Sequence, residues 1–233
     1  VELGSSRNGP DYYSLLNPFL RTNFTENYFS DQLNLFQNKL LLYYKRSKIT
    51  EGLYSEQTSP VEIRKTLFNS SLYPGPGSPI FNIGFISSNR NNGVETIKTT
   101  QDTIKVINNG TLIDSIYSDT IDTRIDLSNK QLNISMTNHF KFWIPQILNV
   151  NILLYDQEDG LTQDTSNSIG YMSKDATSES YGISLKSIYN NYLESTVYLD
   201  VSNYDSGQKG FSHYQKRNVC NVQLNIAYRP KRY

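Results

Sequence analysis

The chain has 233 residues, enough for one large β domain or for one domain with a long extension. Its 22 basic and 22 acidic side chains balance, so no net charge draws it toward DNA or an anionic membrane. A single cysteine, Cys220, excludes an intramolecular disulfide framework, and no apolar run approaches the roughly 18 residues of a membrane-spanning helix.

The composition favours β structure. Hydrophobic residues make up only 37% of the chain, and 18 Tyr and 10 Phe partly offset this low share. Aromatic side chains bury large areas and favour strands. Asn, Ser and Thr are abundant, which is typical of turn-rich β proteins. The first residues, VELGSSRNGPDYY, lack the basic and apolar regions of a signal peptide.

Residues 1–79 are predicted to form an N-terminal arm. Within it, the segment 11–20, DYYSLLNPFL, is too apolar for a free tail. Such segments usually become ordered by lying on another surface. We therefore expect this part of the arm to dock on its own domain or on a neighbouring subunit through Tyr12, Tyr13 and Phe19.

A helical period is present in the arm over residues 30–48. Ser30 or Asp31 can cap a first helical turn. Apolar side chains then recur at spacings of three and four, at Leu33, Phe36, Leu40 and Tyr43 or Tyr44. The spacing predicts a helix over 30–48, with the first three of these side chains as interface residues. A second, shorter helix is predicted over 60–69, because Pro60 can occupy a first helical position.

The segment 73–79, YPGPGSP, interrupts the chain with three prolines and two glycines and cannot form regular structure. We take it as the boundary between the arm and a domain over residues 80–233. Beyond this boundary apolar residues recur at every second position, at Phe81, Ile83 and Phe85, as in a half-buried strand.

The domain is predicted to be an antiparallel β-sandwich. Short strand-like runs follow one another at intervals of about ten residues, separated by turn residues, as in a sandwich or a barrel. Asn109-Gly110 indicates a type I′ hairpin turn. Residues 183–192 are expected to form one short helix at the end of the sandwich. The only tryptophan, Trp143, is expected to anchor the core or an interface. The last strand alternates cleanly, with Val222, Leu224, Ile226 and Tyr228 on one face.

Acidic side chains cluster after the predicted strand 148–155. Asp156, Glu158, Asp159 and Asp164 supply four carboxylates within nine residues. Calcium takes about six to eight oxygen ligands, commonly from a flexible loop. We therefore treat Asp156, Glu158 and Asp164 as candidate calcium ligands, with a solvated acidic turn as the alternative.

The same segment resembles the third calcium loop of C2 domains, which are β-sandwich modules that bind phospholipid or protein partners. In that family a strand ends in an acidic pair, followed by another Asp and then by Ile-Gly. The corresponding residues here are Asp156, Glu158, Asp164 and Ile169-Gly170. The end of the chain, VQLNIAYRP over 222–230, is similar to a C2 closing strand. Over residues 145–230 the resemblance implies a β-sandwich that binds a membrane or a protein, with calcium.

The sequence carries no recognisable catalytic motif. His139 and His213 are the only histidines, which excludes a multi-histidine metal site. It contains no P-loop, Rossmann fingerprint or H-E-x-x-H motif. Basic and aromatic residues mix in the C-terminal quarter, but the neutral overall charge and the lack of a base-reading motif argue against a specific nucleic-acid partner.

These observations predict a non-enzymatic structural subunit of a large assembly such as a virion, neck or tail, located in the cytoplasm or the virion. Its partners would be other protein subunits, including copies of itself in a homo-oligomer. They would contact the aromatic-rich arm, the β-sandwich and Trp143. No cofactor is expected apart from calcium. The alternative hypothesis is a C2-like module that binds a membrane or a protein partner through loop 156–164.

Overall fold

The computed structural model describes residues 1–9, 23–52, 59–94, 98–108, 111–121, 123–161, 173–207 and 214–229. In this part of the chain the regular structure consists of strands, and no α-helix is present. The strands are β1 (Glu2–Asn8), β2 (Phe24–Leu35), β3 (Leu40–Glu51), β4 (Val61–Leu72), β5 (Ile80–Asn91), β6 (Lys98–Asn108), β7 (Thr111–Ile121), β8 (Asp126–Lys141), β9 (Pro145–Asp159), β10 (Ala176–Ile188), β11 (Leu193–Ser206) and β12 (Gln215–Tyr228).

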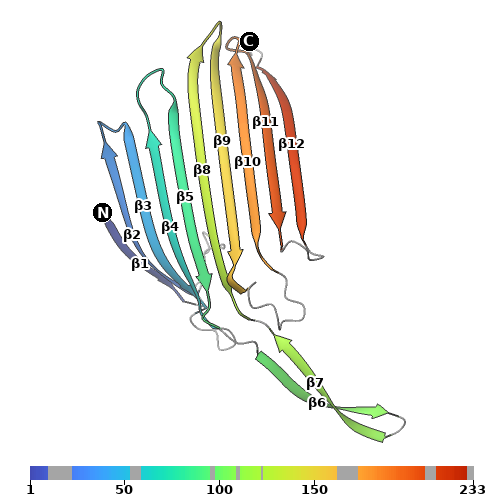
Figure 1. The fold of residues 1–233 in the computed structure, drawn as a ribbon. Coiled ribbons are helices and arrows are strands. Elements are labelled where there is room, and N and C mark those ends of the chain that lie inside the picture. Colours follow the sequence, from blue (N-terminus) through green and yellow to red (C-terminus); the bar gives the residue numbers. More distant parts are fainter. Residues whose placement is uncertain are drawn as a thin grey trace.

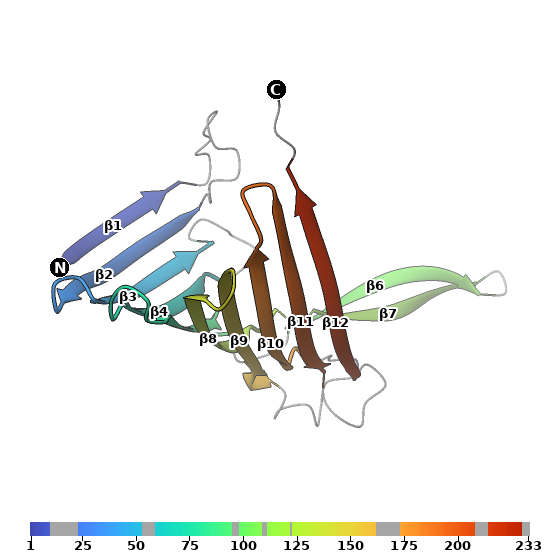
Figure 2. The same ribbon diagram turned by 90° about the horizontal axis from the view of Figure 1, so that it is seen from above.

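Ten of these strands form one antiparallel sheet in the order β1-β2-β3-β4-β5-β8-β9-β10-β11-β12. Each strand therefore pairs with its neighbour along the chain, except where β6 and β7 are inserted between β5 and β8 (Figure 1). Viewed from above, the sheet bends into an open trough with β1 and β12 at its two rims (Figure 2). The mainly β class expected from the sequence is confirmed.

The inserted strands β6 and β7 pair only with each other and form a hairpin that extends beyond one end of the sheet (Figure 1). Asn108 lies opposite Thr111, so the chain reverses at the predicted Asn-Gly turn, which itself lies outside the described residues. Asn92 links the end of β5 to the start of β8 at the base of this hairpin. Its side-chain Oδ1 accepts a hydrogen bond from the backbone N of Ile125 at 3.0 Å.

The helix predicted over residues 30–48 is wrong. This segment contains the end of β2, a turn and most of β3, which pair along their whole length from Phe24↔Glu51 to Leu35↔Leu40. The turn places Phe36, Gln37 and Asn38 at positive φ, between 52° and 65°.

The prediction failed because the same residues satisfy two periods. Leu33 and Leu40 fit one helical face, but Leu33 and Leu35 before the turn, and Leu40 and Leu42 after it, also fit the two-residue period of a strand. Pairing of β3 with β4 on its other side decides between them, because each strand in a sheet satisfies its backbone groups through neighbours distant in sequence.

Two shorter helix predictions are also corrected. Residues 60–69 lie largely in β4, which pairs with β3 and β5. Residues 183–192 lie partly in β10 and partly in the turn to β11. In both places isolated turns of helix would have had to compete with strand neighbours on each side, and tertiary pairing overrides weak local propensity.

The strands on either side of the predicted boundary at 73–79 are neighbours. β4 ends at Leu72, β5 begins at Ile80, and the two pair from Glu62↔Asn91 to Leu72↔Phe81. The division into an arm over 1–79 and a domain over 80–233 therefore stays a prediction, although strands from both parts belong to one sheet.

The sheet forms a single layer, so it has no hydrophobic core of its own. Among the described residues no hydrophobic side chain is buried, and the buried polar and charged residues are Ser30, Ser47, Arg124, Asp159 and Ser187. Antiparallel sheets usually pack one face on a core. In the described part of this chain no second layer covers either face of the sheet, and this decides where a functional surface can lie.

Candidate interaction surface

One face of the sheet carries apolar side chains across nearly its whole width. Residues directly opposite each other on antiparallel strands point to the same face, so the register can be followed from strand to strand. One such row takes one residue from each of nine strands: Leu35, Leu40, Leu72, Phe81, Met136, Val150, Ile183, Leu199 and Val222. Every member of this row is apolar.

The adjacent rows on the same face are also uncharged. The next row holds Leu33, Leu42, Ser70, Ile83, Ile134, Ile152, Tyr181, Val201 and Cys220. On the other side of the first row lie Asn138, Leu148, Leu185, Val197 and Leu224. These three rows form a continuous surface, which we call the apolar face.

The opposite face of the sheet is mostly polar. The row beside the first apolar row runs from β4 to β12 through Ser71, Asn82, Ser135, Asn151, Gly182, Asp200 and Asn221. Polar side chains here bond across strands. Thr137 Oγ1 donates to Asn149 Oδ1 at 2.9 Å, and Asn149 Nδ2 donates to Ser184 Oγ at 3.3 Å. We call this the polar face, although Leu67, Leu153 and some other apolar side chains also lie on it.

Several side chains of the apolar face are more exposed than their chain neighbours on the polar face. Ile183 is 44% exposed and Leu199 38%, whereas the adjacent Gly182 is buried and Asp200 is half-buried. On the edge strand β12, Val222 reaches 71%. A globular protein in water normally shows the reverse, with apolar side chains buried and polar ones outside. Among the residues that the structure describes, nothing covers the apolar face.

Aromatic side chains gather at one end of the sheet, where the tight turns lie. The turns after β2, β4, β8 and β10 and the end of β12 all fall at this end, at the top of Figure 1. Exposed aromatic residues there are Phe36, Tyr73, Phe140, Phe142, Trp143, Tyr189 and Tyr228. The rings of Phe142 and Trp143 lie 4.6 Å apart, and Trp143 is 84% exposed. We call this the aromatic end.

Charged side chains gather at the opposite end, on the same side of the sheet as the apolar face. They are Arg46, Lys48, Glu62, Arg64, Lys130, Asp156 and Glu158. We call this the charged end. An open hollow of about 880 Å³ lies over β1 to β4. It is lined by Arg46, Lys48 and Arg64, together with Phe29 and Tyr44.

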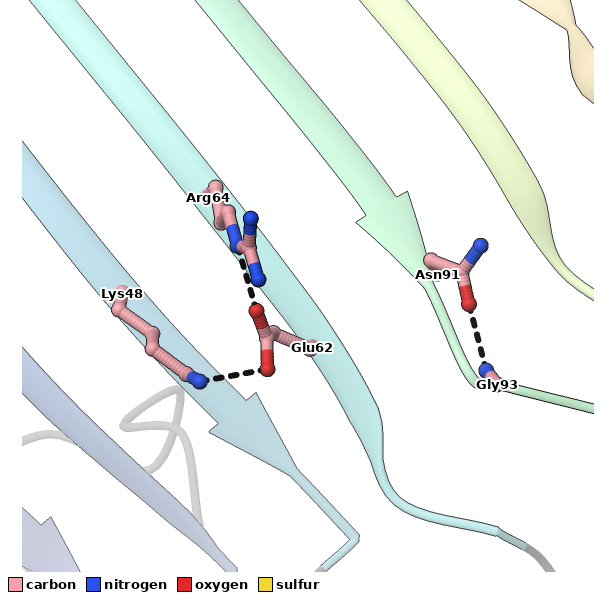
Figure 3. A network of polar contacts seen from close by, with 5 residues as sticks. All are labelled: Lys48, Glu62, Arg64, Asn91 and Gly93. Atoms are coloured by element: carbon pink, nitrogen blue, oxygen red, sulfur yellow. Dashed lines mark hydrogen bonds and ion pairs between the residues drawn. The ribbon is translucent and has the colours of Figure 1, made fainter.

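Glu62 lies between two cations at the charged end (Figure 3). Lys48 Nζ is 2.6 Å from Glu62 Oε2, and Arg64 Nε is 2.6 Å from Glu62 Oε1. The hydrogen bond from Lys48, followed by that from Arg64, lowers the pKa of the Glu62 carboxyl below its ordinary value. Nearby, Asn91 Oδ1 accepts a hydrogen bond from Gly93 N at 2.5 Å in the turn that leaves β5 (Figure 3).

The predicted calcium ligands are only partly described. Asp156 and Glu158 lie at the end of β9, on one face of the strand, and Glu158 Oε2 is 3.8 Å from Lys130 Nζ. Asp164 lies outside the described residues. In the described part of the chain, no three His, Cys, Asp or Glu side chains are grouped so that they could hold a metal ion. Calcium binding by this loop stays a prediction.

The loop is anchored by two other carboxylates. Asp159, only 5% exposed, accepts hydrogen bonds from Leu161 N at 3.1 Å and from Lys174 N at 3.0 Å. Asp175 Oδ1 accepts one from Asp159 N at 2.7 Å. These bonds join the start of the loop to its end. In the sequence, Asp159 stands out only as a member of an acidic cluster, and no motif marks Asp175.

The predicted interface residues fall in different places. Leu33 and Leu40 lie on the apolar face, while Phe36 and Trp143 lie exposed at the aromatic end. Tyr12, Tyr13 and Phe19 lie outside the described residues. Trp143 therefore does not anchor a core within the described part of this chain, and its role at an interface stays a prediction.

Comparison with protein-family models, with curated proteins and with known structures finds no match to this chain. The likeness to C2 domains thus rests on the sequence motifs alone. None of the described residues belongs to a helix of the length and hydrophobicity needed to cross a membrane.

Proposed function

We propose that this chain is a non-enzymatic structural subunit of a larger assembly. In that assembly, strands from other subunits or segments pair with its two edge strands, and a partner surface covers its apolar face. The proposal rests on one observation above all, the nine-residue apolar row that crosses the sheet and that no other described part of the chain covers.

Leaving such a face in water is unfavourable. Burial of apolar surface is worth about 25 cal/mol per Å², or roughly 1.5–3 kcal/mol for one large aliphatic side chain that is fully covered. Monomeric proteins rarely expose contiguous apolar patches beyond a few hundred Å², and larger patches mark interaction sites. A row of nine apolar residues with further apolar rows beside it supports a role in assembly.

The two edges support the same role. Among the described residues β1 pairs only with β2, and β12 pairs only with β11. Proteins usually protect an edge strand by keeping it short or by placing charge or proline along it. β12 has 14 residues and no proline, and its charged side chains, Lys216 and Arg217, lie at its start. Its outer backbone groups are available to another strand.

The assembly can take more than one form. A second sheet over the apolar face would complete the β-sandwich expected from the sequence, and copies of the chain joined edge to edge would give the expected homo-oligomer. A virion, neck or tail particle would combine the two kinds of contact.

Hydrogen exchange read by mass spectrometry tests the proposal. The material should be the protein purified without denaturant from its native source, with its mass measured in parallel. We expect a mass above that of one chain, and amides of β12 that exchange as slowly as those of the central strand β9. A particle of one chain's mass with fast exchange along β1 and β12 would refute the proposal, because unpaired edges exchange readily.

A further inference from the structure

We propose that the apolar face lies against the hydrocarbon interior of a lipid bilayer. This inference names the partner of the surface described above and rests on the proposed function, because the sheet can enter lipid only with its edges paired. The alternative partner is the apolar surface of another protein. Three features of the face favour lipid.

The first feature is the composition of the face. Interfaces between proteins are, taken as a whole, only about as apolar as ordinary protein surface, and their centres are enriched in Tyr, Trp and Arg. The central row here is aliphatic apart from Phe81 and Met136, and the three rows of the apolar face contain no charged residue. A surface this uniform provides few of the directional contacts by which one protein recognises another. Hydrocarbon requires none of them.

The second feature is the height of the apolar band along the strands. It extends over nine residues on β8 (Leu132 to Phe140), on β11 (Leu193 to Val201) and on β12 (Cys220 to Tyr228), with Asn138 and Ser195 as its polar members. On β10 it is shorter, from Tyr181 to Leu185, between Glu179 and Ser187. At roughly 3.4 Å per residue, nine residues measure about 27 Å along a strand. The hydrocarbon core of a bilayer is about 30 Å thick, and the apolar bands of sheets that cross it are about 25 Å tall.

The third feature is the chemistry at the two limits of the band. At the aromatic end Trp143 and several Tyr side chains are exposed, and such rings favour the boundary between hydrocarbon and headgroups. At the charged end Arg46, Lys48 and Arg64 line an open hollow beside the band, at the level where lipid phosphates would lie. Along the register, both limits on β11 and β12 lie two residues further toward the aromatic end than those on β8. A protein partner gives no reason for rings at one limit of the band and cations at the other.

The polar face completes the arrangement. Strands in a sheet that crosses a bilayer alternate between side chains toward lipid and side chains toward water. The Thr137–Asn149–Ser184 ladder and the row through Asn82, Asn151 and Asp200 would face water and polar groups. The outer backbone groups of the edge strand β12, which pairs with no described strand other than β11, cannot remain in hydrocarbon without a partner. This is why the edge pairing proposed above must accompany lipid contact.

Two neighbouring cysteine variants test the inference. In a Cys220→Ala background, Val201→Cys places a thiol on the apolar face, and Ser202→Cys places one on the polar face of the same strand. Both changes nearly conserve volume, so both variants should fold. Each protein is reconstituted into phosphatidylcholine vesicles, collected by flotation and labelled with a membrane-impermeant maleimide. The same labelling is repeated without lipid and in urea.

We expect the thiol at position 201 to react at least tenfold more slowly in vesicles than in urea or in lipid-free buffer, while the thiol at position 202 remains reactive. Equal reactivity at the two positions in vesicles would overturn the inference. So would full protection of position 201 without lipid, because a protein surface would then be the cover and the proposed function would stand alone. Failure of the protein to float with the vesicles would overturn it as well.

Trp143 provides a second readout in the parent chain, since it is the only tryptophan. Its fluorescence should be quenched more strongly by lipids brominated near the headgroup than by lipids brominated near the chain terminus. Absence of quenching by either lipid would contradict the placement of the aromatic end at the bilayer boundary. Edge protection measured by hydrogen exchange is independent of both experiments, so the inference can fail while the proposed function holds.

Discussion

The free-energy cost of an arginine on the apolar face should depend on its depth if lipid covers this face, and should not if water does. We take Leu199→Arg as the test. Leu199 lies in the central apolar row, between Ile183 on β10 and Val222 on β12. Asn203 lies four residues further along the same face of β11, toward the charged end. Arg at these two positions would differ in depth within the band by about 14 Å, at roughly 3.4 Å per residue along the strand.

The expected costs differ accordingly. Arg on a lipid-facing strand costs about 2–4 kcal/mol near the middle of the bilayer and about 0–1 kcal/mol near its boundary. Leu199→Arg should therefore destabilise the reconstituted protein by about 2–4 kcal/mol, and Asn203→Arg by about 1 kcal/mol or less. Without lipid, Leu199 is already 38% exposed, so its replacement should change stability by only about 0.5 kcal/mol.

Urea titration in phosphatidylcholine vesicles, followed by the fluorescence of Trp143, measures these costs. Leu199→Met serves as a control, because it changes neither volume nor charge appreciably and should cost less than about 1.5 kcal/mol. Equal costs for arginine at positions 199 and 203 would refute the reasoning, as would a cost at position 199 that is the same with and without lipid.

Three further predictions concern the sheet itself. Gln37 sits at φ 57° in the turn between β2 and β3. Gln37→Gly should therefore stabilise the fold by about 1 kcal/mol in thermal unfolding, whereas Gln32→Gly within β2 should destabilise it. Loss of stability on Gln37→Gly would contradict the turn geometry. The hydrogen bond from Lys48 lowers the pKa of Glu62 in the folded protein. The stability that this ion pair contributes is therefore present above the pKa of Glu62 in the unfolded chain, and it is lost as the pH falls through the lower pKa of the folded state. Lys48→Met should raise the Glu62 midpoint in an NMR titration, and an unchanged midpoint would exclude this ion pair in solution. Asp159→Ala should cost about 2–4 kcal/mol in urea unfolding, because two backbone N–H donors lose a buried carboxylate acceptor; a cost near zero would show that these bonds do not anchor the loop.

Part of the fold is predictable from local pattern. The two-residue period of Phe81, Ile83 and Phe85 predicts strand β5, and that of Val222, Leu224 and Ile226 predicts β12. The turn signal at 109–110 correctly separates β6 from β7. These segments are predictable because a strand period of two differs clearly from a helical period when the alternation is strict.

The helix predictions show where local pattern is insufficient. Leu33, Leu40 and Tyr44 satisfy a helical spacing, and they also satisfy strand spacing once a turn lies between Leu35 and Leu40. Only the long-range pairing of β2, β3 and β4 distinguishes the two. The candidate site was equally dependent on pairing, since the nine members of the apolar row lie in nine separate strands and are not contiguous in sequence.

The sequence by itself determined the β class, the strict alternation of several strands, the turns at 73–79 and 109–110 and the acidic cluster after β9. Each of these depends on residues close together in the chain. Only the tertiary structure decided that the strands form one layer, that their apolar residues align on one face, and that aromatic and charged residues lie at opposite ends. The physical reason is register, because a shift of one residue between two neighbouring strands would move an apolar side chain to the polar face and break the row.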